Sequence, residues 1–348
     1  MLKQFSLLLM ILASLLLAGC QSSAPAVTSQ PNSSLSASPA ASAVAEASAS
    51  PAESPAATEA AAAPTDATRT VADALGAEIE VPAAPQRIVV LTQEDLDAAL
   101  ALGVMPAGIT NGQGQNTPPR YLGERVAGLR VVGDLLRPNL ESVAAVNPDL
   151  ILAGDMNDEQ VIAQLGEIAP TVVTMDVDDD WKTHFAKVAE VLNKQDAGTR
   201  VLADYDAEVQ AVKAALGANA NARVSVVRWG PTGPSYMQPK QFSVLVLTDL
   251  GLQRPAHQPD DGFTHSMPLS LEQINLIDGD WLFLGTLSPE GEDATAMQSA
   301  RDTPVFQQLA AVKNNHVVAI DGAVWSSRGG VLAAQVVLDD VRKALSAS

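Results

Sequence analysis

The stretch NLESVAAVNPDLILAG, residues 139–154, has a counterpart of the same pattern, SLEQINLIDGDWLFLG, at residues 270–285. In both copies a polar residue precedes Leu-Glu, and two apolar residues follow three positions apart. An Asp then leads into an apolar run that ends at Gly. A pattern that recurs once at this distance predicts two similar halves of one chain.

Each copy is typical of a short helix that leads into a buried strand. Asn139 and Ser270 are good N-caps, because their side-chain oxygens accept hydrogen bonds from the first free amides of a helix. The spaced apolar residues form one helical face, and the apolar run suits a strand that is covered on both sides. The repeat therefore predicts two α/β lobes, each with a Glu at an equivalent helix start.

The bulk composition limits the possible partners. The chain has 348 residues, of which 47% are apolar, and this is enough for two domains with a sizeable core. Its formal net charge is −19. Binding to nucleic acid or to an anionic membrane surface requires a basic face, so we expect no nucleic-acid partner.

The N-terminal segment is typical of a bacterial lipoprotein. A lysine at position 3 precedes an apolar run over 5–17, and the sequence LAGC at 17–20 resembles a lipobox, the signal for cleavage before a lipid-bearing cysteine. We expect a signal peptide over 1–19 and lipidation of Cys20, the single cysteine, which would anchor the chain to the membrane. The alternative is a plain signal peptide or membrane anchor in which the cysteine is incidental.

Residues 20–68 are dominated by Ala, Ser, Pro and Thr and have few large apolar side chains. Such a segment buries too little surface to offset chain entropy, so we expect a disordered tether. From there strands and helices alternate, which predicts parallel sheets with crossover helices. We expect one α/β lobe over 69–193, a long connecting helix over 194–217 and a second α/β lobe over 218–348.

Several short motifs, in order along the chain, resemble those of one family. They are PAAPQRIVVL at 82–91 after Gly76, VGD at 132–134 with PNLE at 138–141, NPDLI at 147–151, and SLEQI at 270–274. The chain resembles the substrate-binding lipoproteins of ABC importers for ferric siderophores and vitamin B12, the periplasmic binding proteins of class III. The resemblance implies two Rossmann-like lobes with parallel sheets, joined by one long helix, and a binding domain over 86–348.

The resemblance also gives the two glutamates of the repeat a role. In such importers one Glu on each lobe docks on the permease, and Glu141 and Glu272 occupy the matching positions. Two separated charges would orient the encounter and speed it. The simpler interpretation is that a Glu in the first turn only complements the helix dipole.

Candidate ligand contacts lie where loops leave the strands of the second lobe. Arginine binds anionic oxygens of a chelate, and aromatic rings cover its organic face. The sequence offers five such residues in this lobe: Arg228, Trp229, Tyr236, Trp325 and Arg328. The alternative for the rings is packing in the core. In the first lobe Gln93 and the loop 111–116 are suitably placed, but no residue there is singled out.

Other functions were weighed against this one. A receptor for bare zinc or manganese needs clustered ligands, whereas the four histidines are scattered; His257 and His265, which flank an acidic loop, are the ones to check. Vitamin B12 or haem remains an alternative ligand, and a surface adhesin would share the tether. No nucleophile elbow, phosphate loop or dinucleotide motif is present, so we expect no enzyme. The sequence thus predicts an extracytoplasmic, lipid-anchored receptor that captures an Fe(III)-siderophore complex, delivers it to an ABC permease and holds no permanent cofactor.

Overall fold

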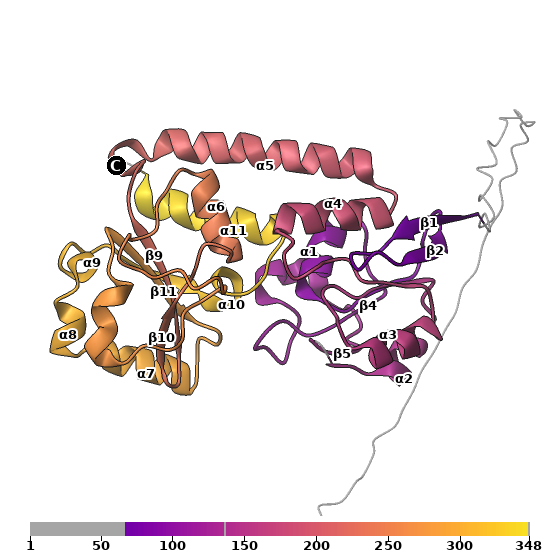
Figure 1. The fold of residues 1–348 in the computed structure, drawn as a ribbon, viewed down its shortest axis with the longest axis horizontal. Helices are drawn as coiled ribbons and strands as arrows, with labels where there is room; N and C mark the ends of the chain where they lie inside the picture. Colours follow the sequence, from indigo (N-terminus) through magenta and orange to yellow (C-terminus); the bar gives the residue numbers. More distant parts are fainter. Residues whose placement is uncertain (1–66, 136, 347–348) are drawn as a thin grey trace, which may run out of the picture. The chain divides into compact units, whose positions relative to one another are not determined.

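The computed structural model of the chain describes residues 67–135 and 137–346. The predicted signal peptide, Cys20 and almost all of the predicted tether lie outside these residues. Two four-stranded sheets organise the described part (Figure 1), and we call each sheet with its helices a lobe. The predicted α/β class with two lobes is confirmed.

The first lobe is built on a parallel sheet with strand order β4-β3-β7-β8. Its strands are β3 (Ile88–Val90), β4 (Gly108–Ile109), β7 (Leu150–Leu152) and β8 (Thr171–Val172). Its helices are α1 (Gln93–Ala101), the 3₁₀ helix η1 (Arg120–Val126), α2 (Leu140–Ala144), α3 (Glu159–Gly166) and α4 (Trp181–Val191). Two small antiparallel ladders complete it, β1 (Thr68–Ala72) with β2 (Glu78–Pro82) and β5 (Gly133–Asp134) with β6 (Arg137–Pro138).

The second lobe is built on a sheet with strand order β10-β9-β11-β12. Its strands are β9 (Val224–Gly230), β10 (Gly233–Tyr236), β11 (Trp281–Thr286) and β12 (Val317–Asp321). Its helices are α6 (Phe242–Asp249), η3 (Leu271–Ile277), α7 (Glu292–Arg301), α8 (Pro304–Gln307), α9 (Ala310–Lys313), α10 (Gly322–Trp325) and α11 (Val331–Leu345). The sheet is parallel except for β10, an antiparallel edge strand in a segment that the sequence suggested was only a turn.

One long helix, α5 (Gln195–Ala215), lies between the two sheets in the sequence and is followed by the short 3₁₀ helix η2 (Gly217–Asn219). Figure 1 shows α5 running beside α4 and α11, and these helices are in contact. Its buried side chains, Tyr205, Val209 and Val212, keep the helical spacing expected from the sequence. The predicted single connecting helix is confirmed.

The repeated stretch forms equivalent structures in the two lobes. Asn139 caps α2, and its side chain accepts a hydrogen bond from the amide of Ser142 at 2.8 Å. The apolar runs become β7 and β11, both central in their sheets. The glycines that end the runs are needed for space, because a Cβ at Gly154 would collide with Thr92 and one at Gly285 with the carbonyl of Ile320.

The aspartate of each copy fixes the start of the neighbouring strand. Asp149 accepts hydrogen bonds from the amides of Gln86 at 2.7 Å and Arg87 at 2.9 Å, directly before β3. Asp280 accepts from the amide of Arg223 at 2.8 Å, directly before β9, and pairs with the guanidinium of the same residue. The repeat thus positions the central strands of both sheets.

A buried carboxylate joins the two lobes. Asp97 on α1 accepts hydrogen bonds from the amides of Leu332 and Ala333, at 2.8 and 2.9 Å, and so caps the start of α11. The hydroxyl of Tyr121 donates to Asp97 at 2.8 Å. The largest apolar core is continuous here, since it includes Leu96 of α1 and Val337 of α11. This side of the junction therefore combines a continuous apolar core with buried hydrogen bonds to Asp97.

None of the helices in the described residues is long and apolar enough to span a bilayer.

Replacing Asp97 with alanine should lower the free energy of unfolding by about 3 kcal/mol. A lost cap costs about 1 kcal/mol, and leaving buried donors without a partner costs about 1–3 kcal/mol more. Asp158→Ala is the matched control, because Asp158 also accepts from two amides but at the exposed start of α3. We expect a loss of about 1 kcal/mol there. Urea denaturation measures both, and equal losses would contradict a special role for the junction.

Candidate functional site

A cavity of about 390 Å³ lies between the two lobes. Its walls come from the carboxyl ends of the strands in both sheets, the position at which open α/β sheets bind ligands. The first lobe contributes the start of α1, the loops after β4, β7 and β8, and the start of α4. The second lobe contributes the end of β9, the start of α6 and the loop between α10 and α11. The cavity lies at strand ends, where the sequence led us to expect ligand contacts.

Arg228 is the cation that the second sheet presents to this cavity. It lies near the end of β9, is partly buried, and has its Nη2 atom 3.4 Å from Nε2 of His265. Burial lowers the pKa of the guanidinium from its usual value, while Asp293 raises it. The usual pKa of an arginine is so high that Arg228 stays charged despite this lowering. Within the described residues Arg228 has no ion pair.

Arg328 lies at the junction of the two lobes. Its Nη1 atom is 3.3 Å from the carboxylate of Asp155 and 3.1 Å from the sulfur of Met175, both in the first lobe. Its backbone carbonyl accepts a hydrogen bond from the side-chain amide of Gln93 at 2.8 Å. The guanidinium is therefore positioned at the cavity, but it is already paired with an acid.

Glu94 is the most buried acidic side chain on the cavity wall, only 7% exposed. Burial raises its pKa to about 7, and the neighbouring charge of Asp155 adds to the rise. Its carboxylate has no hydrogen bond or ion pair to another side chain in the part of the chain that the structure describes. Thr92, which accepts from the amide of Asp95 at 3.3 Å, fixes the start of α1 and so the position of Glu94.

The next acidic residue of α1 lies behind the cavity. Asp95 is fully buried and accepts hydrogen bonds from Thr174 at 2.6 Å and from the ring of His184 at 2.9 Å. Burial lowers the pKa of His184, but Asp95 raises it more, so that the net pKa is above its usual value. His184 therefore serves inside the first lobe and does not face the ligand.

The three aromatic residues predicted at the site lie elsewhere in the second lobe. Trp325 is fully buried, packs on Phe283 and donates to Asp340 at 2.9 Å. Trp229 and Tyr236 are buried in a separate core of this lobe. Trp229 follows Arg228 in β9, and adjacent strand residues point to opposite faces. The structure thus brings Arg228 and Arg328 together at the cavity and leaves the three rings in the core.

Another aromatic pair does line the cavity, and the sequence interpretation missed it. Trp181 at the start of α4 and Phe242 at the start of α6 meet edge to face, with centroids 6.0 Å apart. Asp180, the last residue of the acidic run Asp178 to Asp180, caps α4 by accepting from the amide of Thr183 at 2.7 Å. All three of these aspartates also line the cavity. The local sequence around these aspartates does not show that they face the second lobe.

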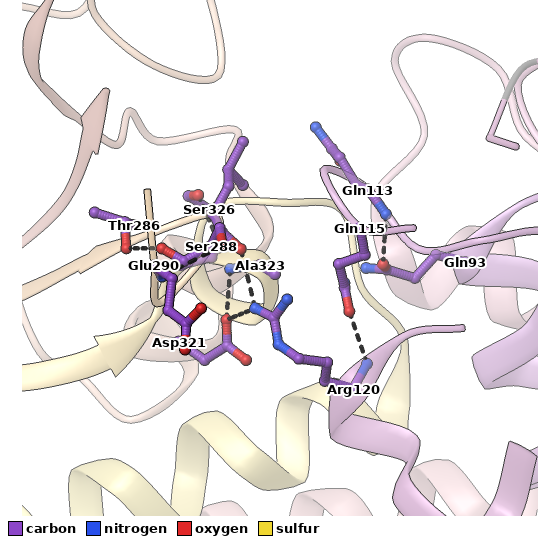
Figure 2. A network of polar contacts seen from close by, with 12 residues as sticks. Gln93, Gln113, Gln115, Arg120, Thr286, Ser288, Glu290, Asp321, Ala323 and Ser326 are labelled. Carbon is purple, nitrogen blue, oxygen red and sulfur yellow. Dashed lines mark hydrogen bonds and ion pairs between the residues drawn. The ribbon is translucent and has the colours of Figure 1, made fainter. Parts of the chain in front are cut away.

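A second contact between the lobes involves Arg120, the first residue of η1 (Figure 2). The guanidinium of Arg120 donates to the carbonyl of Leu287 and pairs with Asp321, both at 2.9 Å. Asp321 also caps α10 through the amide of Ala323 at 2.9 Å. The two ion-paired side chains remain about one-third exposed, at 34% and 37%. Exposed pairs contribute only about 0–1 kcal/mol, so this contact is weaker than the buried Asp97 junction.

The other predicted residues are placed as follows. Glu141 and Glu272 are exposed in the first turns of α2 and η3. A hydrogen bond with Ser270 lowers the pKa of Glu272. Of the two histidines to be checked, His265 lines the cavity and His257 does not. Within residues 67–135 and 137–346 no three His, Cys, Asp or Glu side chains are grouped to hold a metal ion.

The fold and the cavity define a class: a two-lobed α/β protein that encloses a ligand between its sheets. A family model described as periplasmic binding protein matches residues 88–324, more than half of the chain. The chain belongs to this periplasmic binding protein family.

Individual relatives extend the comparison. The chain is 35% identical over 282 residues to the "Probable siderophore-binding lipoprotein YfiY" of Bacillus subtilis, covering 79% of this chain and 86% of that one. It is 28% identical to the achromobactin-binding periplasmic protein of Dickeya dadantii, over 74% of this chain and 86% of the relative. The structure of Staphylococcus aureus SirA complexed with staphyloferrin B superposes with a TM-score of 0.70 at 28% identity, covering 80% of this chain and 98% of SirA.

The buried Glu94 predicts an unusual pH dependence of stability. Because its pKa is about 7 in the folded protein and near 4.5 in the unfolded chain, the folded state binds more protons between these values. Its contribution to stability is therefore lost as pH rises through this window. Glu94→Gln should be more stable than the parent at pH 8, by about 2–3 kcal/mol, and the difference should vanish near pH 4.

Thermal or urea unfolding between pH 4 and 8 measures this difference. Glu159→Gln is the control, because Glu159 is exposed on α3 and should show no such gain. A parent and Glu94→Gln that keep the same stability difference at every pH would show that Glu94 is not held in a desolvating site.

Proposed function

We propose that this protein is the lipid-anchored substrate-binding component of an ABC importer, and that it captures a ferric siderophore between its two lobes. The observation that carries the proposal is the interlobe cavity, which is lined by Arg328 and by Arg228, and Arg228 has no ion pair within the described residues. Two relatives support it, since YfiY is named a probable siderophore-binding lipoprotein and the structure of SirA was solved in complex with staphyloferrin B.

The cavity chemistry is that of binding and not of reaction. Arg228 supplies a charge to the anionic oxygens of a ferric chelate, and a guanidinium makes charge-assisted hydrogen bonds to such oxygens. Arg328 supplies a second charge once it exchanges Asp155 for the ligand. Trp181 and Phe242 offer apolar surface to the organic part of the siderophore. The ferric complex is cargo that is passed on to the permease, and it is not a cofactor that stays bound to this protein.

The three predicted rings do not line this cavity. Trp325 packs on Phe283, and Trp229 and Tyr236 lie in a separate core of the second lobe. We therefore assign ligand contact to Arg228 and Arg328 and leave Trp229, Tyr236 and Trp325 in the core.

Delivery to the permease is assigned to the two glutamates of the repeat. Glu141 and Glu272 are both exposed, lie one on each lobe and occupy equivalent helix starts. Because the two charges lie on separate lobes, the distance between them depends on how the lobes are arranged. Cys20 would carry the lipid, and residues 20–68 would act as the tether that lets the binding domain reach its permease at the extracytoplasmic face.

Titration of intrinsic fluorescence tests the ligand, because Trp181 lies on the cavity wall. We expect a ferric siderophore to quench the emission, with cyanocobalamin, haem and free zinc or manganese producing no saturable change. Tight binding of bare zinc or manganese alone would contradict the proposal.

Arg228→Ala should weaken binding of an anionic ferric chelate by about 10- to 100-fold, because a hydrogen bond to a charged group contributes about 1.5–3 kcal/mol. Arg125→Ala is the matched control, since Arg125 is exposed at η1 and lies away from the cavity. Unchanged affinity of Arg228→Ala would remove Arg228 from the site.

Reversing both docking charges, Glu141→Arg with Glu272→Arg, should abolish siderophore-dependent growth under iron limitation while affinity in solution stays the same. Glu159→Arg with Glu292→Arg is the matched control, because these residues are also exposed first-turn glutamates, one on each lobe. Normal uptake by the first pair, or equal loss with both pairs, would contradict docking through the repeat.

A further inference from the structure

We infer that Glu94 is the ligand contact of the first lobe, and that the site takes a ferric chelate that carries a protonated amine. The inference rests on the proposed function and adds the charge distribution of the ligand to it. It starts from the charged side chains that line the cavity and from the partners that each of them has.

Four of the five carboxylates on the cavity wall already have partners. Asp155 pairs with Arg328 at 3.3 Å, and Asp178 pairs with Lys240 at 3.1 Å. Asp179 accepts from the amide of Asp176 at 2.8 Å, and Asp180 caps α4. Among the described residues that line the cavity, Glu94 is the one carboxylate with no hydrogen bond or ion pair to another residue, since its own amide is its only donor, and it is also the most buried of the five.

The neighbours of Glu94 on α1 show that this is not a general property of the helix. Asp95 is bonded to Thr174 and His184, and Asp97 to Tyr121 and the start of α11. Both are fully buried and both accept hydrogen bonds from other residues, although Oδ2 of Asp95 has no partner among the described residues. A buried carboxylate without a donor from another residue is unfavourable, so a donor is expected to meet Glu94 when the site is filled.

The cations of the cavity show the complementary pattern. Arg328 and Lys240 are each paired with an aspartate, and Arg228 is the one Arg or Lys on the described cavity wall without an ion pair. On the described cavity wall the first lobe thus offers one carboxylate and the second lobe one guanidinium that have no ion pair. A ligand that suits both has chelate oxygens that accept hydrogen bonds at one end and a cationic donor at the other.

This arrangement distinguishes classes of ferric chelate. A tris-catecholate complex carries three negative charges distributed around the iron, so it would place negative charge against Glu94 and the neighbouring Asp155. A trihydroxamate complex is neutral at the iron, and an ammonium arm gives it the donor that Glu94 lacks. A charge-assisted hydrogen bond between ammonium and carboxylate is among the stronger polar contacts in proteins.

Two chelates that differ only in the amine test the inference. Ferrioxamine B is a trihydroxamate with one ammonium arm, and its N-acetyl derivative has the same iron centre without the charge. At pH 8, above the pKa of about 7 of Glu94, we expect the parent protein to bind ferrioxamine B at least about 10-fold more tightly. In Glu94→Gln the two affinities should become equal, whereas the exposed Glu159→Gln should keep the preference.

Each other outcome has a defined meaning. Equal binding of the two chelates by the parent protein, or a preference that survives in Glu94→Gln, overturns the inference and leaves the proposed function intact. Binding of ferric enterobactin, a tris-catecholate, but of neither hydroxamate overturns it in the same way. If no ferric chelate binds at all, the proposed function fails and the inference fails with it. A Glu94→Gln variant that loses both chelates equally would show that Glu94 shapes the site without contacting the amine.

Discussion

Helix α1 buries three acidic side chains within four residues, and the placement of these charges governs the junction of the lobes and the site between them. Each carboxylate must find a donor or lose stability. Asp95 finds one inside the first lobe, and Asp97 finds donors across the junction at the start of α11. Glu94 lines the cavity and has no donor from another residue in the part of the chain that the structure describes. Contacts within the first lobe, assembly of the two lobes and the proposed ligand contact are thus divided among neighbouring positions of one helix.

Two of the contacts between the lobes differ in strength. Around Asp97 the lobes share a continuous apolar core with buried hydrogen bonds, whereas the Arg120–Asp321 pair is partly exposed. Relative movement of the lobes would break the exposed pair at little cost and would leave the buried junction intact. Such an arrangement limits how far the cavity can change shape, so the charges on its walls are held at nearly fixed positions before the ligand arrives. Preorganisation of this kind favours affinity by reducing the cost of ordering.

The sequence predicted most of the fold because the repeat encodes it locally. Asn139 caps the helix that directly follows it, and Asp149 contacts the start of a strand with a strong apolar pattern. The connecting helix keeps a clear 3.6-residue spacing of its buried side chains. The ligand site was predicted only in part. Adjacent residues of a strand point to opposite faces of the sheet, so Arg228 and Trp229 cannot both face the ligand. This rule alone would have removed Trp229 from the predicted ligand contacts. Glu94 and Trp181 could not be singled out, because they line the site only through packing against residues far along the chain.

A crystal structure of the protein with a ferric siderophore, with an anomalous difference map at the iron absorption edge, tests the central claim most directly. We expect one iron peak in the interlobe cavity, with siderophore oxygens filling its coordination sphere and protein side chains contacting only the organic ligand. An iron peak ligated directly by protein side chains, or one located outside the cavity, would contradict capture of an intact ferric chelate between the lobes.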